Sequence, residues 1–278
     1  MSKGDLHIHT SVSDGMLPPA QVAARARAAG MGFFALTDHN SVAGIAQAEE
    51  ALGADGPQLI RGVELTAQPE WGEEIHVLGY GFAADCPELR ELCRTICRRK
   101  REQLRQILSR LQDVGVKVDP SHMEHRDDED SYRGRPVLAE LLLQNGVVNT
   151  FGQAFAQYLG SRGCAYVPMR PVSPQVCIEA VHAGGGVAVL AHPRISTIDQ
   201  WLQRLTDMGL DGIEAYRPGL TGNEQLYVEK AAEHFGLLLT GGSDWHGRRG
   251  DVPLGSFYVR RASLTAFFEA VGAVDPAV

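Results

Sequence analysis

The sequence predicts an α/β protein in which strands and helices alternate around a parallel sheet, with one helical insertion. Two observations predict the alternation. Short apolar runs recur along the 278 residues, and several stretches between them carry helix start and stop signals. A third observation predicts the insertion: the block 86–163 has helical spacing and little strand character.

The strands are expected at the short apolar runs, which are bounded by turn residues. The predicted strands are Asp5–Thr10, Phe33–Asp38, Gln58–Leu65, Ile75–Gly81, Ala165–Pro168, Gly186–His192, Gly212–Tyr216, Leu237–Gly241 and Ser256–Val259. Among the helices between them, Ser173 followed by Pro174 has the pattern of an N-cap and a first helical residue. Ser41 is expected to cap another helix.

The insertion is expected to hold three helices. Apolar residues follow helical spacing from Leu89 to Leu111, and further helices are predicted at Arg135–Asn145 and Phe151–Leu159. The acidic run Asp127–Asp130 is expected to be an exposed loop.

The predicted domains are therefore a sheet domain of residues 1–85 and 164–278 and a helical insertion, 86–163, that contributes to the substrate pocket.

Composition excludes several classes of protein. Hydrophobic residues make up 44% and charged residues 22%, as in ordinary globular chains, and the net charge of −8 argues against binding nucleic acid through bulk charge. Apolar runs such as Val187–Ala191 are too short to span a bilayer, and no secretory signal is evident at the N-terminus. Five cysteines, an odd number, favour reduced thiols in the cytoplasm. We expect the protein neither to bind a membrane nor to need an obligate protein partner.

The first predicted strand carries the pair His7 and His9. Residues two apart on a strand project to the same face, so both imidazoles would point one way and Leu6 and Ile8 the other. A His-x-His pair has the spacing of metal ligands, although an alternating strand with two ordinary histidines would look the same.

Other candidate ligands recur at the carboxyl ends of predicted strands, where functional groups gather in parallel α/β sheets and barrels. Buried groups of this kind need partners, which a metal cluster provides, so a metal site is favoured over unrelated polar strand ends. The candidates at or after strand ends are Asp38, His39, Glu64, His192, Asp244 and His246, and a further candidate, His76, lies within the predicted strand Ile75–Gly81.

The ordered set of motifs resembles the PHP (polymerase and histidinol phosphatase) superfamily of metal-dependent phosphoesterases, over nearly the whole chain. The motifs are Asp5-Leu6-His7-Ile8-His9-Thr10, Ser13-Asp14-Gly15, Thr37-Asp38-His39, Gly62-Val63-Glu64, His76, Ala191-His192-Pro193 and Ser243-Asp244-Trp245-His246. The resemblance implies a distorted (β/α)7 barrel with a helical insertion. Within the superfamily, the chain is most similar to stand-alone bacterial enzymes that act on 3′,5′-bisphosphate nucleotides and on RNA 5′ ends.

The resemblance implies a site for three metal ions. One ion would be held by His7, His9, Glu64 and Asp244; a second by bridging Glu64 with His76 and His192; a third by Asp14, His39 and His246. Asp38 would either orient an imidazole from outside the ligand shell or secure a strand end.

The ligand types favour Mn²⁺, with Fe²⁺ or Zn²⁺ as alternatives, over an all-oxygen Ca²⁺ or Mg²⁺ site. Three divalent ions with three carboxylates and neutral imidazoles carry a charge near +3, which suits a phosphate dianion. A water bridging the metals would be deprotonated near neutral pH and would attack phosphorus in line. The residues predicted to carry the catalysis are Glu64, Asp244 and His246. The leaving group would take its proton either from His246 or from a metal-bound water, and the sequence does not choose between them.

Two arginines of the insertion are candidates for binding substrate phosphate. Arg135 is expected to open a helix, as a pair with Gly134 that matches a phosphate-contacting pair in relatives, and Arg162 is a second candidate. The alternative for Arg135 is a surface ion pair with the acidic run. Basic residues between Arg94 and Arg110 either track an RNA backbone or form a solvated helix face.

The predicted function is hydrolysis of the 3′-phosphate of nucleoside 3′,5′-bisphosphates, with stepwise 5′→3′ hydrolysis of short 5′-phosphorylated RNA. Two alternatives stay open: histidinol-phosphate phosphatase or another small phosphomonoesterase, and a metal-stabilised scaffold or binding module. A nicotinamide-binding enzyme is disfavoured because no G-x-G-x-x-G turn follows the first strand.

Overall fold

The computed structural model describes residues 2–53, 56–70, 74–118, 134–170 and 172–273. The chain divides into two compact units. The first unit comprises Met1–Cys93 and Pro171–Val278, and the second comprises Arg94–Arg170. Each unit is described by itself.

The first unit is built on an eight-stranded sheet in the order β7-β6-β5-β4-β3-β2-β1-β8. Its strands are β1 (Lys3–Asp5), β2 (Phe33–Leu36), β3 (Gln58–Ala67), β4 (Ile75–Tyr80), β5 (Val187–Leu190), β6 (Gly212–Tyr216), β7 (Leu238–Gly241) and β8 (Val259–Arg260). Strands β1, β2 and β3 are parallel, as are β5, β6 and β7, whereas β4 runs antiparallel to both of its neighbours. The short β8 is antiparallel to β1.

The sheet curls so that the chain following β1 comes beside the end of β7. The N–H of Leu6 donates to the carbonyl of Gly241 over 3.2 Å, and the N–H of His9 donates to the carbonyl of Trp245 over 2.8 Å. The chain after β1 therefore pairs with the end of β7 and with the segment that follows it, and the sheet becomes a nearly closed barrel. The predicted α/β barrel is confirmed, including its distortion, which the antiparallel β4 introduces.

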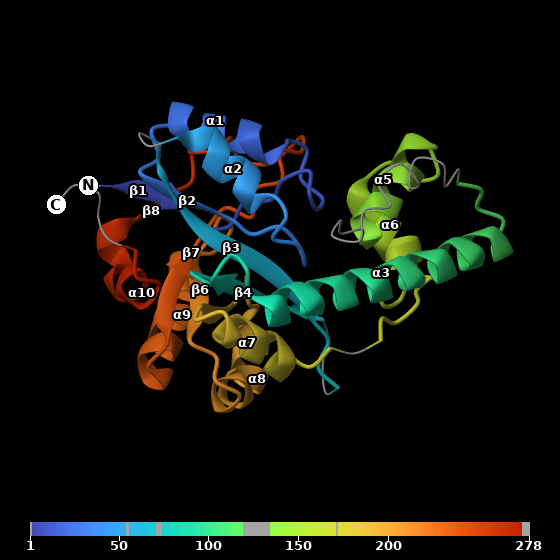
Figure 1. Ribbon diagram of the computed structural model, residues 1–278. Helices are drawn as coiled ribbons and strands as arrows, with labels where there is room; N and C mark the ends of the chain where they lie inside the picture. The colour runs from blue at the N-terminus through green and yellow to red at the C-terminus, as the bar shows by residue number, and fades with distance from the viewer. Residues whose placement is uncertain (1, 54–55, 71–73, 119–133, 171, 274–278) are drawn as a thin grey trace. The chain divides into compact units, whose positions relative to one another are not determined.

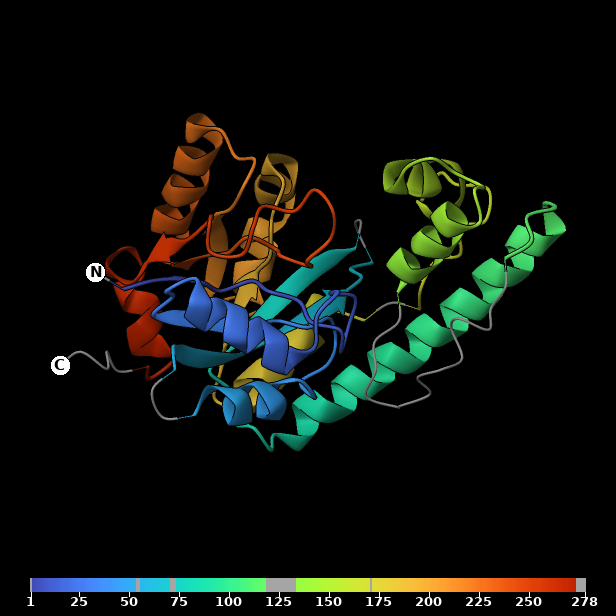
Figure 2. The same cartoon turned by 90° about the horizontal axis from the view of Figure 1, so that it is seen from above.

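Helices cover the outside of this barrel (Figure 1). They are α1 (Pro19–Ala28), α2 (Ile45–Leu52), α7 (Pro174–Ala183), α8 (Ile195–Asp207), α9 (Gly222–Phe235) and α10 (Thr265–Ala270). Helices α1 and α2 lie side by side on one side of the strands in both views, and α7, α8 and α9 lie on another (Figures 1 and 2). The described helices include none long and apolar enough to cross a membrane.

Two capping predictions had different outcomes. The Ser173 hydroxyl accepts a hydrogen bond from the N–H of Gln175 over 3.2 Å, so the predicted N-cap of α7 is confirmed. The cap predicted at Ser41 is wrong, because α2 begins at Ile45 with Gly44 in the cap position. The Ser41 hydroxyl instead accepts from the N–H of Ala43 and stabilises the turn before the helix.

The strand residues are buried on both faces because helices cover the barrel outside and side chains fill it. Leu6 packs with Phe33 and Tyr80, while Ile8 belongs to a separate cluster with Val22 and Phe34. The apolar residues on either side of His7 thus anchor this segment in two hydrophobic clusters.

The second unit is helical. Helix α3 (Pro87–Asp113) extends into it from the first unit, and α5 (Arg135–Gln144), α6 (Phe151–Ala154) and a π-helical turn (Phe155–Leu159) follow. The strand predicted at Ala165–Pro168 is wrong, since these residues are irregular. The apolar residues Ala165 and Val167 are two apart, as in a strand, but they are buried because both pack into the helical core. The acidic run 127–130 lies outside the described residues.

Candidate metal centre

The barrel places the predicted ligands at one end of its strands. His7 and His9 follow β1, His39 follows β2, and His192 follows β5. The other members lie in β3, in β4, in the loop before α1 and in the segment after β7: Glu64, His76, Asp14, Asp244 and His246. Six separate stretches of chain therefore deliver imidazoles and carboxylates to the same region.

Glu64 is the centre of this arrangement, and its side chain is 0% exposed. One carboxylate oxygen, Oε2, lies 3.2 Å from His9 Nε2 and 3.1 Å from His39 Nδ1. The other, Oε1, lies 2.8 Å from His76 Nδ1 and 2.9 Å from His192 Nε2. The carboxylate thus faces imidazoles with both oxygens, as a bridging ligand would.

Three groups of side chains each bring their donor atoms within 4.8 Å of one another: His7, His9, Glu64 and Asp244; His9, Asp14, His39 and His246; and His39, Glu64 and His76. The first matches a predicted ligand set, and the second contains another with His9 added. The third contains His39 where the prediction has His192. His192 Nε2 nevertheless lies 3.2 Å from His76 Nδ1, so it borders the same cluster.

Several donor atoms in the cluster are buried without a hydrogen-bond partner in the described part of the chain. They are His7 Nε2, both ring nitrogens of His9, Asp14 Oδ1 and Glu64 Oε2. Leaving such atoms unsatisfied costs free energy, and nitrogen and carboxylate lone pairs that converge in this way are the donors that transition metals bind. The residues present therefore fit a multinuclear metal centre.

Charge interactions among these groups oppose the effect of burial. Burial alone would raise the pKa of Glu64, but the surrounding imidazoles, led by His39, hold it well below its usual range. Burial lowers the pKa of His9, yet Asp244 and Glu64 outweigh it and raise that pKa to about 10. Burial and the neighbouring charges thus act on these groups in opposite directions.

The backbone is strained at three strand ends that bear on the site. Asn40, His192 and Asp244 have positive φ angles of 50°, 29° and 56°, which are uncommon for residues other than glycine. The Asn40 side chain is clamped to Thr66, donating to its hydroxyl over 2.9 Å and accepting from its N–H over 2.8 Å. This strain is retained because neighbouring hydrogen bonds hold the backbone in place.

Glu214, in the interior of β6, is a functional residue that sequence reasoning missed. Its carboxylate is 1% exposed and lies 3.0 Å from His7 Nδ1. The other carboxylate oxygen accepts from the backbone N–H of His192 over 2.7 Å. Because a carboxylate accepts, the proton of His7 sits on Nδ1 and Nε2 is directed at the cluster. The signal was a glutamate in an otherwise apolar strand, Gly212–Tyr216.

Asp5 and Gly242 hold the two edges of the barrel together beside His7. The Asp5 carboxylate accepts from the N–H of His7 over 3.1 Å, and from the N–H and hydroxyl of Ser243 over 2.9 and 2.5 Å. A Cβ atom on Gly242 would lie 2.3 Å from the Cβ of His7, so only glycine allows this approach.

Arg248 was also missed. Its guanidinium donates to the Asp14 carboxylate over 3.0 Å and to the Asp14 carbonyl over 2.8 Å. Asp14 Oδ1 lies 3.2 Å from His246 Nε2, so Arg248 fixes the carboxylate that faces this imidazole. The sequence signal was weak because an arginine in a glycine-rich loop is usually solvated.

Asp38 has the second of its two predicted roles. Its carboxylate accepts from the N–H and hydroxyl of Thr10 over 2.8 and 2.7 Å and from the hydroxyl of Ser13 over 2.6 Å. These contacts favour a role in securing the loop that carries Asp14 over one in orienting an imidazole.

The candidate phosphate-binding arginines belong to the second unit. Arg135 is the first residue of α5; its guanidinium donates to the Leu159 carbonyl over 3.4 Å and lies 6.0 Å from the Phe155 ring centroid. Arg162 is exposed in the turn that follows the π-helical segment. In the basic stretch of α3, Arg98 and Arg105 are exposed, whereas Lys100 is buried.

Comparison with known proteins agrees with this geometry. A family model for the PHP domain matches residues 5–137. The chain is 34% identical to a 5′-3′ exoribonuclease of Haemophilus influenzae, over 91% of this chain and 93% of that one. It is 30% identical to a phosphoribosyl 1,2-cyclic phosphate 1,2-diphosphodiesterase of Eggerthella lenta, with coverage of 92% and 98%. It is 28% identical to a 3′,5′-nucleoside bisphosphate phosphatase of Chromobacterium violaceum, with 88% coverage of each.

Among solved structures, a protein of Bifidobacterium adolescentis, inferred to be a metal-dependent phosphoesterase, superposes with a TM-score of 0.84 at 28% identity. The alignment covers 99% of this chain and 97% of that one. Since the motifs, the barrel and the full-length relatives agree, this chain belongs to the PHP family and is a hydrolase of phosphate esters.

Proposed function

We propose that this enzyme hydrolyses the 3′-phosphate of nucleoside 3′,5′-bisphosphates and degrades short 5′-phosphorylated RNA stepwise from the 5′ end. The observation that carries the proposal is the convergence of imidazoles on the two oxygens of buried Glu64, with inward donor atoms that lack hydrogen-bond partners. The names of two full-length relatives support this choice of substrate.

We assign three ion positions to the cluster. His7, His9, Glu64 and Asp244 hold one ion; Glu64, His76 and His192 a second; Asp14, His39 and His246 a third, with Mn²⁺ preferred and Fe²⁺ or Zn²⁺ as alternatives. Bound metals supply Lewis acidity that neutralises phosphoryl oxygens and lowers the pKa of water. The protein's own contribution is to direct the imidazole nitrogens and carboxylate oxygens at these positions.

The hydrogen bonds of the imidazoles support this assignment because they fix tautomers. His246 Nδ1 lies 2.8 Å from the Asp244 carbonyl, which can only accept, so Nδ1 carries the proton. His246 Nε2 then presents its lone pair toward Asp14. In this tautomer His246 serves as a ligand rather than as the general acid for the leaving group.

A substrate panel tests the proposal. Purified enzyme loaded with Mn²⁺ is assayed with adenosine 3′,5′-bisphosphate, short 5′-phosphorylated RNA, histidinol phosphate and a phosphoribosyl cyclic phosphate. We expect the highest kcat/KM with the bisphosphate and release of mononucleotides from the RNA 5′ end. A preference for histidinol phosphate or the cyclic phosphate would reassign the substrate, and turnover of none of the four would favour a scaffold role.

We propose that the enzyme acts in the cytoplasm. The five cysteines form no disulfide, and all five are described residues. This fits the cytoplasm, which keeps thiols reduced.

A further inference from the structure

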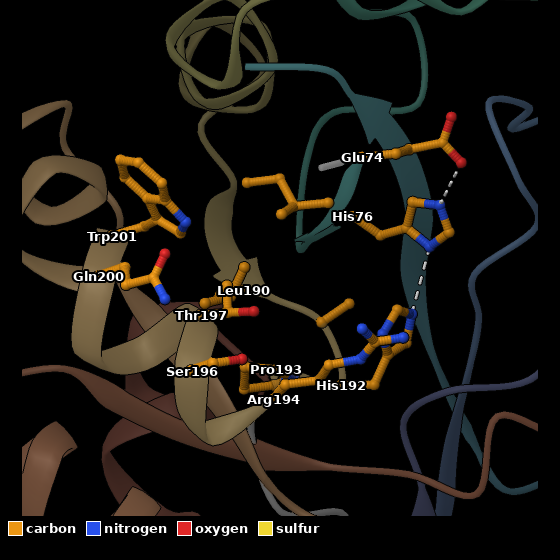
Figure 3. Close-up of a pocket in the computed structure, with 12 residues that line it drawn as sticks. Glu74, His76, Leu190, His192, Pro193, Arg194, Ser196, Thr197, Gln200 and Trp201 are labelled. Atoms are coloured by element: carbon orange, nitrogen blue, oxygen red, sulfur yellow. Dashed lines mark hydrogen bonds and ion pairs between the residues drawn. The ribbon is translucent and has the colours of Figure 1, made fainter. Parts of the chain in front are cut away.

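A cavity of about 460 Å³ adjoins the metal centre within the first unit. His76 and His192 line one end of it, and Gln200 and Trp201 line the opposite end (Figure 3). A ligand phosphate at the two histidines therefore leaves room along the cavity for the rest of the molecule. Ligand pockets typically hold about 300–1,000 Å³, so the volume suits one nucleotide better than a phosphate alone.

The far end of the cavity is formed by one face of α8. Thr197, Gln200 and Trp201 are spaced i, i+3 and i+4, which places them side by side on this face. The guanidinium of Arg204 lies over the indole of Trp201, 5.1 Å from its centroid. This contact restrains the ring, and a restrained ring loses less conformational entropy when a planar ligand stacks on it.

The walls between the two ends suit a planar heterocycle. Ile75 and Leu190 supply apolar surface, and the amide of Gln200 offers both a donor and an acceptor. Glu74 and Arg194, which also line the cavity, have formal charges that cancel. These walls therefore offer no net positive charge to a second phosphate dianion, and an uncharged base does not need one.

We propose that this cavity binds the nucleobase of the substrate, with Trp201 as the stacking platform and Gln200 as a hydrogen-bonding partner. The inference rests on the proposed nucleotide substrate and names the residues that distinguish a nucleotide from a small phosphomonoester. Stacking tolerates any base, so Trp201 serves a bisphosphate nucleotide and a terminal RNA nucleotide equally.

The test compares two substrates in two enzymes. Wild type and Trp201→Ala, both loaded with Mn²⁺, are assayed with adenosine 3′,5′-bisphosphate and with an abasic analogue, 1-deoxyribose 3,5-bisphosphate. Base–aromatic stacking predicts a fall in kcat/KM of about 5- to 150-fold for the nucleotide in Trp201→Ala. The abasic analogue should be cleaved equally by both enzymes, and Trp201→Phe should retain most of the nucleotide activity.

Tyr258→Ala is the matched control, because Tyr258 is an aromatic residue of the first unit that is 40% exposed and does not line the cavity. Thermal melting of each variant checks folding. An equal loss for both substrates in Trp201→Ala, or no loss for either, would overturn the inference while leaving the proposed function intact.

Binding of adenosine 5′-monophosphate separates the two ideas if wild type cleaves neither substrate. Failure to cleave would refute the proposed function. The cavity inference would still predict that Trp201→Ala weakens binding of this nucleotide by about tenfold. Equal binding by both proteins would refute the cavity inference as well.

Discussion

The two units hold their polar groups in different ways. In the barrel unit, each carboxylate beside the metal centre is tied to separate stretches of chain; Glu214 alone joins His7 to the backbone of His192. In the helical unit, the Arg135 guanidinium donates to the Leu159 carbonyl and lies 6.0 Å from the Phe155 ring centroid. The barrel unit thus joins distant stretches of chain through its carboxylates, whereas these contacts of Arg135 are with the nearby π-helical turn of its own unit.

The largest expected effect follows from removing a ligand in the barrel unit. His9→Ala or Asp244→Ala should reduce phosphatase turnover by at least about 10³-fold, because each side chain belongs to a group of converging donors. The folded barrel should persist, since apolar clusters rather than these side chains form its core. Activity assays measure the turnover and circular dichroism measures the fold, while elemental analysis measures the metal loading of each variant. Wild-type turnover by either variant at full metal loading would refute the ligand assignment.

A smaller effect is expected from Glu214→Gln, which retains the shape of the side chain but not its charge. The weaker partner for His7 Nδ1 should lower metal affinity by about 10- to 100-fold. Metal titration and the ¹⁵N shifts of the His7 ring, which report its tautomer, measure this. Glu233→Gln on the surface of α9 is the control. Unchanged affinity and tautomer in Glu214→Gln would show that Glu214 merely fills space.

The helical unit should respond in substrate affinity alone. Arg135→Ala should raise the KM for a bisphosphate nucleotide by about tenfold if its guanidinium binds phosphate, with metal content unchanged. Arg260→Ala, an exposed arginine on β8, is the control. A loss of thermal stability with no change in KM would make Arg135 a packing residue of its own unit and so sharpen the contrast between the units.

The smallest expected effect is a difference in reactivity between a buried thiol of the barrel unit, Cys177, and an exposed thiol of the helical unit, Cys164. Burial raises the pKa of Cys177 in α7 to about 12, whereas Cys164 is exposed in the second unit. Iodoacetamide should label Cys164 in the native protein and Cys177 after unfolding, as mass spectrometry would show. Because the folded-state pKa of Cys177 exceeds the ordinary value of 9.0, its contribution to stability should decline as pH rises above about 9. Rapid native labelling of Cys177 would contradict this.

Much of the site could be predicted because its chemistry lies at strand ends. His7 and His9 form a recognisable pair, and Glu64 and Asp244 lie at or after the ends of predicted strands, so the sequence indicates them as candidates. Their grouping into ligand sets came from the ordered motifs that resemble the PHP superfamily. Glu214 and Arg248 were missed because neither lies at a predicted strand end or in one of the family motifs. Only the fold shows that Glu214 meets His7 and that Arg248 meets Asp14.

The errors in secondary structure have physical causes. Alternation at Ala165–Pro168 resembles a strand, but packing between helices also buries every second residue of an extended segment. The strand predicted at Asp5–Thr10 is wrong, because β1 covers Lys3–Asp5 and shares only Asp5 with it. Beyond Asp5 the chain exchanges its sheet partner for the segment at Trp245, a change that no local pattern reveals.

The seam where Leu6 meets Gly241 has a consequence for the order in which the site is assembled during synthesis. His7 is made well before Asp244, which lies 3.4 Å from it in the finished fold. Each proposed ligand set that includes Asp244 or His246 therefore stays incomplete until the segment after β7 has been made. We expect metal to be retained at these positions only by chains that extend at least to His246.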